Sequence, residues 1–166
     1  MQLRTEKITR LAMLLALSLV LFIVELQIPF LPAVPGLKLG LANVVTLFLL
    51  WYFPFREVVL VLAARVLLAS FFAGGVSTLA FSLAGGLLAV CGSACLHRLY
   101  PDASMLMIGI LGAILHHTGQ IAVAVLLLTT TDVLYYYPFL LGASFVTGSV
   151  TGCIASLVER RLRKHT

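Results

Sequence analysis

Charged side chains are scarce in this 166-residue chain, at 10% of all residues, against about 25% in an ordinary soluble domain. Hydrophobic residues make up 61% of the sequence, and the mean hydropathy is +1.13. A soluble protein of this size cannot bury so much apolar surface, so the composition predicts an integral membrane protein. Each helical crossing of a bilayer needs about 20 apolar residues, so the length allows roughly six crossings in one membrane domain, residues 1–166.

Cysteine is also sparse, and its spacing is not that of a metal site. Cys91 and Cys95 are four residues apart instead of three, and Cys153 is remote from both. No cluster of histidines or further cysteines could complete a tetrahedral site. All three cysteines lie within apolar segments, which favours an interpretation as small packing residues. We therefore expect no bound metal.

Three motifs that would indicate catalysis are missing. The sequence has no Gly-x-x-x-x-Gly-Lys-Ser/Thr loop for nucleotide phosphates, and no paired aspartates that could hold Mg²⁺ against a diphosphate. No serine, histidine and aspartate can be grouped by spacing into a catalytic triad. We therefore expect no catalytic residues, no cofactor and no enzymatic activity. Nucleic-acid binding is not expected either, because most basic residues flank apolar runs instead of forming a solvated face.

The apolar residues fall into six segments of helical length, separated by residues that break helices. Prolines follow the first and second segments, and a Gly-Gly pair follows the third. The alternation of polar and apolar positions that marks a membrane β-strand is absent, so helices are the expected spanning elements. The expected fold is an all-α bundle of six transmembrane helices. Their expected ranges are 8–27, 37–53, 57–73, 77–97, 103–130 and 134–158.

Basic residues near the segment ends predict the orientation of the bundle. Lysine and arginine collect in cytoplasmic loops. Here they precede the first segment, follow the sixth, and occur in the second and fourth connections. This distribution places both termini in the cytoplasm and leaves Lys38 near the opposite surface. The first segment is expected to be a retained helix instead of a signal peptide, because its apolar stretch extends to Leu26 and similar segments follow it.

Six polar residues lie where an apolar environment is expected. Ionisable side chains within a membrane usually face a cavity or a partner, and these residues come from four different segments. A single concave site, open to the outside, could collect them all. Two fixed cations against one carboxylate would favour an anionic group such as a phosphate or a carboxylate. The candidate substrate-binding residues are Glu25, Lys38, Asn43, Arg65, His116 and Gln120.

Several of these residues also have a purely structural interpretation. Arg65 could pair with Glu25 as an ion pair, and Lys38 could extend its ammonium group to the outer headgroups. Asn43 could join two helices by a hydrogen bond. His116 could be a hydrogen-bonded core histidine. The case for a site rests on all of these residues together, because every structural interpretation would have to hold at once.

The fifth segment places its two histidines on different faces. His116 and Gln120 are four residues apart and so share one helix face. His117 points about 100° away from His116, and it need not serve the same site. The loop at 27–36 is apolar but contains three prolines, so it cannot be a continuous helix. We expect it to lie on the bilayer surface or to cover the site as a lid, and we favour the lid.

Small residues predict where helices approach one another in lipid. Serine and glycine recur every fourth residue at Ser144, Gly148 and Gly152, and similar spacings occur in the fourth segment. Packing within the bundle is the expected role of these two segments. Ala12 and Ala16 mark one face of the first segment.

The run Pro35-Gly-Leu-Lys-Leu-Gly-Leu-Ala-Asn43 resembles the entrance of the second helix in the substrate-binding subunits, or S-components, of energy-coupling factor (ECF) vitamin transporters. More closely, the whole chain resembles the Gx transporter family, also labelled heptaprenyl diphosphate synthase component I. The other matching pieces are Arg65 followed by 72–75, and the run 112–120. The family pattern has His-Asn where this chain has two histidines, which weakens any specific role for His117.

This resemblance implies a capture subunit for a small, anionic vitamin, cofactor or precursor in the cell membrane. Its implied partners are a transmembrane coupling subunit, on which Ala12 and Ala16 would dock, and ATPase subunits that supply the energy. The alternative is a non-catalytic membrane accessory component of polyprenyl diphosphate or menaquinone biosynthesis, or of a membrane electron-transfer system. The missing aspartate motif argues against catalysis under the synthase label.

Overall fold

The computed structural model describes residues 2–27, 40–73 and 75–164, and every regular element in these ranges is a helix. The all-α fold class is therefore confirmed. The elements in chain order are α1 (Gln2–Gln27), α2 (Leu41–Tyr52), α3 (Phe55–Ala73), α4 (Val76–Leu99), α5 (Met105–Leu128), the 3₁₀ helix η1 (Asp132–Tyr136) and α6 (Tyr137–Arg163).

Four segments of the described chain are long and apolar enough to cross a membrane, which makes this a multi-pass membrane protein. They are Thr5–Gln27, Val76–Leu99, Met105–Leu128 and Asp132–Leu162. α2 is apolar but has only 12 residues, about 18 Å of helix against a bilayer core of about 30 Å. α3 has 19 residues but carries three charged side chains. Length and composition thus support four of the six expected crossings.

The helix ends differ from the expected ranges mainly where charged residues lie. α1 begins at Gln2 instead of residue 8, and α6 continues to Arg163 instead of residue 158. Hydropathy marks only the apolar part of a helix, so it misses turns that continue beyond the apolar stretch. At the other end of α6 the chain first forms η1, and Pro138 lies in the first turn of α6, where its missing N–H has no cost.

α2 is the central element of the bundle, although it is the shortest α-helix. It contacts each of the other five α-helices. Its buried apolar side chains belong to two core clusters: Val45 and Leu49 pack with residues of α3 and α4, and Val44 and Leu47 pack with residues of α5 and α6. α2 is apolar because it is surrounded by protein on most sides, which explains how a helix too short to span a bilayer still resembles a membrane segment.

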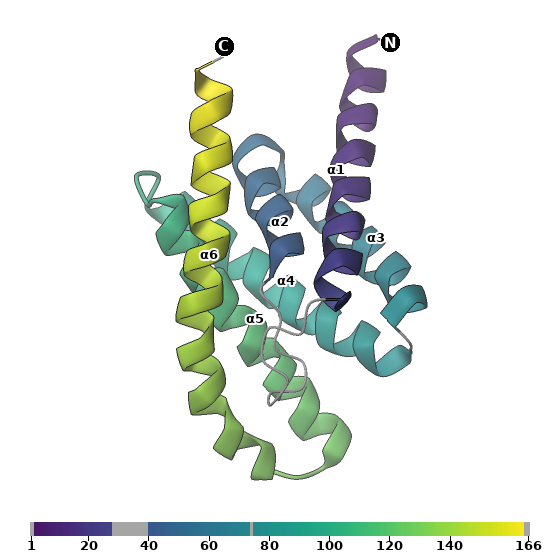
Figure 1. Ribbon diagram of the computed structural model, residues 1–166, viewed down its shortest axis with the longest axis vertical. Coiled ribbons are helices and arrows are strands. Elements are labelled where there is room, and N and C mark those ends of the chain that lie inside the picture. Colours follow the sequence, from purple (N-terminus) through teal and green to yellow (C-terminus); the bar gives the residue numbers. More distant parts are fainter. Residues whose placement is uncertain (1, 28–39, 74, 165–166) are drawn as a thin grey trace.

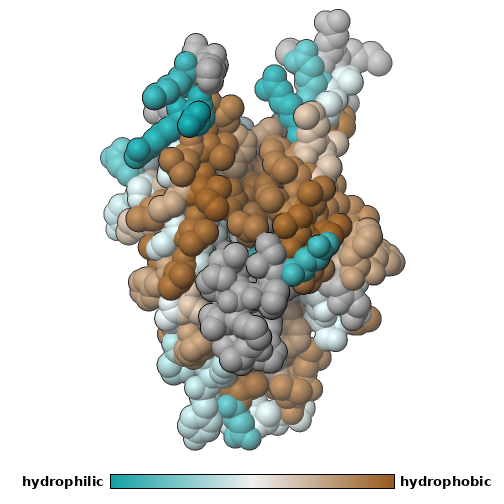
Figure 2. All heavy atoms as spheres, viewed as in Figure 1, coloured by the Kyte–Doolittle hydropathy of each residue, from teal (hydrophilic) through white to brown (hydrophobic). Residues whose placement is uncertain are grey.

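The arrangement gives the molecule two different ends. α1 begins and α6 ends at the same end of the bundle (Figure 1), and their basic residues lie there. Figure 2 shows hydrophobic side chains over the middle of the visible face and hydrophilic ones towards both ends. The large exposed hydrophobic side chains of α1 and α3, such as Met13 at 67% and Leu60 at 67% exposure, are suited to contact with lipid.

The small-residue spacing of α6 brings it into backbone contact with α5. A Cβ atom on Gly148 would lie 2.6 Å from the Cα of Ile110, and one on Gly152 would lie 2.6 Å from the Cα of Leu106. Any larger residue would force the two helices apart. The packing role predicted for this spacing is confirmed.

The interpretation of the cysteines as packing residues is wrong. Cys91, Cys95 and Cys153 are all exposed and all free. An apolar run does not distinguish the lipid-facing side of a membrane helix from its buried side, because both sides are apolar.

Candidate functional site

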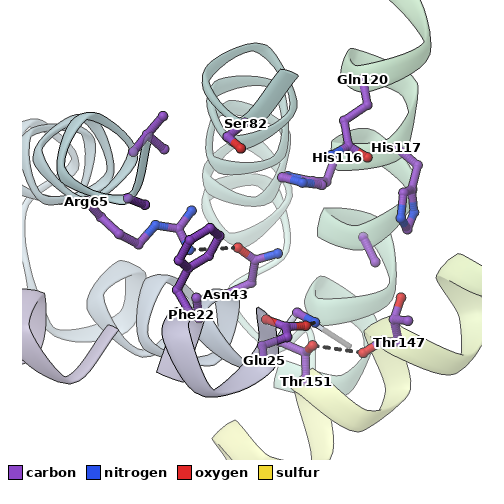
Figure 3. A pocket seen from close by; sticks show the side chains of 15 residues that line it. Phe22, Glu25, Asn43, Arg65, Ser82, His116, His117, Gln120, Thr147 and Thr151 are labelled. Atoms are coloured by element: carbon purple, nitrogen blue, oxygen red, sulfur yellow. Dashed lines mark hydrogen bonds between the residues drawn. The ribbon is translucent and has the colours of Figure 1, made fainter. Parts of the chain in front are cut away.

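A cavity of about 80 Å³ lies at the centre of the bundle and is lined by residues of all six α-helices (Figure 3). Five of the six predicted site residues line it; the sixth, Lys38, lies outside the described residues. We call this space the polar cavity. Its polar side chains are Glu25, Asn43, Arg65, Ser82, His116, His117, Gln120, Thr147 and Thr151.

Arg65 places a positive charge at the wall of this cavity. The residue is only 5% exposed, and its Nη1 donates a long hydrogen bond of 3.3 Å to Oδ1 of Asn43. A guanidinium has five N–H donors, and this is the single hydrogen bond that it makes within the described part of the chain. Burying a charge in an apolar bundle is costly unless it is paired. The arginine therefore keeps donor capacity for a further group with negative charge.

Glu25 faces the same cavity from α1 and fixes the start of α2. Its Oε1 accepts a hydrogen bond from the backbone N–H of Gly40, which lies at the N-terminus of α2 with a left-handed φ of 79°. A carboxylate is favourable at the positive end of a helix dipole. Glu25 also acts electrostatically on Arg65.

The structural alternative of a direct ion pair between Arg65 and Glu25 is not found. The described residues form one ion pair, between Lys7 and Glu57, whose Nζ and Oε1 atoms lie 2.5 Å apart. The carboxylate of Glu25 therefore balances the buried cation from a distance, and it does not occupy the donors of the guanidinium.

The two histidines of α5 both line the polar cavity (Figure 3). His117 is buried, and its Nδ1 lies 2.7 Å from Oγ of Ser144 on α6. Because that hydroxyl donates to the carbonyl of Leu140, Nδ1 of His117 is the donor to Ser144. The spacing argument that set His117 apart from the site did not foresee this, because the cavity extends around more than one face of α5. His116 faces the cavity toward α3 and α4, against the backbone of Gly85.

Two threonines of α6 complete the wall and were not found from the sequence. Thr147 and Thr151 are both buried, and the Thr151 hydroxyl donates to the carbonyl of Thr147 at 2.8 Å. They are four residues apart and alternate with Gly148 and Gly152, so they share one helix face. The four-residue spacing of the two threonines could have indicated a polar helix face. The small residues around them were instead interpreted as helix-packing residues alone.

The chemistry of the polar cavity suits binding of an anion. Its polar groups include a guanidinium, two carboxamides, two imidazoles and several hydroxyls, and its described lining has one carboxylate, that of Glu25. Guanidinium and amide N–H groups form strong, charge-assisted hydrogen bonds with carboxylates and phosphates. Within residues 2–27, 40–73 and 75–164, no group of three or more His, Cys, Asp or Glu side chains could hold a metal ion.

A comparison with known families gives a match that covers most of the chain. A model of the heptaprenyl diphosphate synthase component I family matches residues 14–158. The chain belongs to this family. No curated protein and no solved structure matches it. The match begins within α1 and ends within α6, so all the described residues of the polar cavity fall inside the part that defines the family.

Two other predicted features lie outside the cavity. Ala12 and Ala16 are both exposed on α1, so a partner protein could reach them, and neither lines the polar cavity. Of the loop predicted at 27–36, only Gln27 lies within the described residues, as the last residue of α1.

Proposed function

We propose that this member of the heptaprenyl diphosphate synthase component I family is the substrate-capture subunit of an ECF-type transporter in the cytoplasmic membrane. Its substrate is a small, anionic vitamin, cofactor or precursor. The observation that carries the proposal is the position of Arg65: a buried cation at the wall of a central cavity, with one hydrogen bond, of 3.3 Å to Asn43, among the residues that the structure describes. A purely structural arginine would be expected to have its donors paired within the protein.

In this proposal the anionic group of the substrate binds the guanidinium of Arg65. Asn43, His116 and Gln120 donate further hydrogen bonds and fix the orientation of the substrate, while Glu25 holds the start of α2 beside them. We propose that Lys38 contributes a second positive charge. Binding is favourable because the low dielectric of the apolar bundle strengthens each charge-assisted hydrogen bond.

The orientation that we propose has six crossings with both termini in the cytoplasm. The common end of α1 and α6 supports it (Figure 1), because exposed basic residues such as Lys7, Arg10 and Arg160 lie at that end. The polar cavity then opens towards the outside, where a nutrient arrives.

Energy for transport would come from other proteins, because the chain has no nucleotide-binding loop of its own. We propose a transmembrane coupling subunit, which docks on Ala12 and Ala16, and two ATPases bound to it. Small residues let two membrane helices approach closely, and both alanines are exposed.

Replacing Ala16 by tryptophan tests this docking separately from capture. Ala16→Trp should abolish uptake and co-purification of the coupling subunit, while the purified protein retains its bound small molecule. Leu17→Trp is the matched control, because Leu17 is the next residue, is also exposed and points about 100° away. Loss of the bound molecule from Ala16→Trp, or equal loss of uptake in both variants, would contradict the docking role.

A second function is favoured by the name of the matched family. A non-catalytic membrane component of heptaprenyl diphosphate synthesis would recruit a soluble synthase and offer the polar cavity to a prenyl diphosphate. The single carboxylate in the described lining does not supply the paired acidic ligands that Mg²⁺-dependent catalysis needs. Purification of the chain from its own host in mild detergent distinguishes the two functions: an ATPase-containing complex supports capture, and a soluble synthase with aspartate-rich motifs supports the accessory function.

A further inference from the structure

A second cavity, of about 50 Å³, adjoins the polar cavity. Asn43, Ala113 and Thr151 line both cavities. These three residues come from three different helices, α2, α5 and α6. They therefore lie around the junction between the two cavities, instead of on one side of it.

The two cavities follow one another along the axis of the bundle. On α5 the polar cavity contacts residues between 113 and 120, and the second cavity contacts residues between 108 and 113. On α2 the polar cavity contacts residues between 40 and 43, and the second contacts residues between 43 and 50. α3 and α4 repeat this order. The second cavity therefore continues the first towards the end of the bundle where α1 begins, over about 7.5 Å of α5.

The lining changes from polar to apolar at the shared boundary. The described residues that line the second cavity carry no charge. Its walls are mainly apolar, as at Leu50, Leu62 and Ile108, and beyond the shared boundary their polar side chains are the hydroxyls of Thr46 and Ser93. A mainly apolar, uncharged cavity of this kind favours an apolar group over a charged one. Below we call it the apolar cavity.

We propose that the two cavities together bind one amphiphilic ligand. Its anionic group, a phosphate or a carboxylate, binds at Arg65, and a short aliphatic substituent extends past Asn43 into the apolar cavity. This deepens the capture function and rests on it for the position of the anionic group. It restricts the substrate class to compact anions that carry a short hydrocarbon chain, and it makes a small inorganic anion a poor ligand.

The affinity of such ligands should increase with the length of their hydrocarbon chain. Each methylene moved from water into an apolar site strengthens binding about fourfold. Isothermal titration of the full-length protein in mild detergent would use two series: inorganic phosphate, ethyl phosphate and butyl phosphate, and then acetate, butanoate and hexanoate. We expect at least a tenfold gain between the first and last member of one series, and loss of binding in Arg65→Gln.

Filling the apolar cavity should remove this gain. Ala89 lines the apolar cavity and not the polar one, so Ala89→Leu should bring the affinities within a series close together. Ala122→Leu is the matched control, because Ala122 is exposed on α5 and lines neither cavity. Leu50→Ala provides a second test, which does not require Ala89→Leu to fold. It enlarges the apolar cavity, so the protein should then bind hexyl phosphate more tightly than butyl phosphate.

The outcomes separate the two proposals. Equal affinity along both series in the wild-type protein, with binding lost in Arg65→Gln, would overturn the amphiphilic ligand and leave anion capture standing. Absence of binding for every member of both series would overturn both proposals. A chain-length gain that persists in Ala89→Leu and is unchanged in Leu50→Ala would place the hydrocarbon chain elsewhere and would also overturn the inference.

Discussion

The two halves of the bundle form the polar cavity in different ways. α4, α5 and α6 meet through backbone atoms: a Cβ on Gly119 of α5 would lie 2.8 Å from the carbonyl oxygen of Ala84 on α4, and one on Gly148 of α6 would lie 2.6 Å from the Cα of Ile110 on α5. α1, α2 and α3 pack through larger apolar side chains, such as Val45 and Leu62. Backbone contacts cannot adjust, whereas side chains can change rotamer. We therefore call α4, α5 and α6 the rigid half of the bundle, and α1, α2 and α3 the adaptable half.

The charged side chains of the site also differ between the two halves of the bundle. Glu25, Asn43 and Arg65 come from the adaptable half, while the rigid half contributes imidazoles, hydroxyls and Gln120. We infer that the rigid half sets the shape of the cavity, and that the adaptable half adjusts its charged groups to the ligand.

Removing the charge of Arg65 should affect binding far more than folding. Arg65→Gln keeps a hydrogen-bonding side chain but removes the cation, and we expect affinity for an anionic ligand to fall at least a hundredfold, or about 2.7 kcal/mol. Arg56→Gln is the matched control, because Arg56 is an exposed arginine of the same helix. Titration with the alkyl phosphate series measures the difference. Equal affinity in the two variants would show that the adaptable half does not bind the anion.

Adding one methyl group to the rigid half should destabilise the bundle. A Cβ on Gly148 would lie 2.6 Å from a backbone atom of α5, whereas one on Gly142 of the same helix would have nothing within 4 Å. We expect Gly148→Ala to lower the free energy of unfolding by about 1–3 kcal/mol, as overpacking does. Thermal unfolding in detergent compares it with Gly142→Ala. Similar melting of the two variants would contradict the rigid contact.

Losing the buried hydrogen bond between α5 and α6 should have a smaller effect. Ser144 is 0% exposed and accepts from His117, so Ser144→Ala removes the side-chain acceptor of a buried imidazole and leaves its bond to the backbone of Ala113. We expect a loss of about 1–2 kcal/mol in stability. Ser156→Ala removes a hydroxyl that bonds only within its own helix, to the carbonyl of Cys153, and should change stability much less. Unfolding measurements on both variants check the order of these effects.

The smallest effect is expected from the ion pair between α1 and α3. Lys7 is 45% exposed at its side chain, so water and salt screen its attraction to Glu57. We expect Lys7→Met to lower stability by less than about 1 kcal/mol, and the difference from wild type to shrink as salt is raised. A large loss of stability that does not change with salt concentration would show that the adaptable half depends on the ion pair between Lys7 and Glu57.

The sequence predicted some residues of the polar cavity, charged and uncharged, and missed others. Glu25, Arg65 and His116 were identifiable because an ionisable side chain in an apolar helix is unusual. Thr147 and His117 were not, because a threonine among small residues fits helix packing equally well, and because adjacent positions on a helix normally face different surroundings.

The helices show the same limit. Hydropathy located all six of them, but it could not show that α2 is short and enclosed by protein, or that Cys91 faces outward. Both distinctions depend on what surrounds a residue in space, and a membrane helix has apolar surroundings on the protein side and on the lipid side alike.

Native mass spectrometry of the gently purified full-length protein, with release and identification of small molecules, tests the central claim most directly. The wild-type protein should carry a compact anion with a short hydrocarbon chain, Arg56→Gln should retain it, and Arg65→Gln should lack it. An empty wild-type protein, or the same bound molecule in wild type and Arg65→Gln, would contradict capture at the polar cavity.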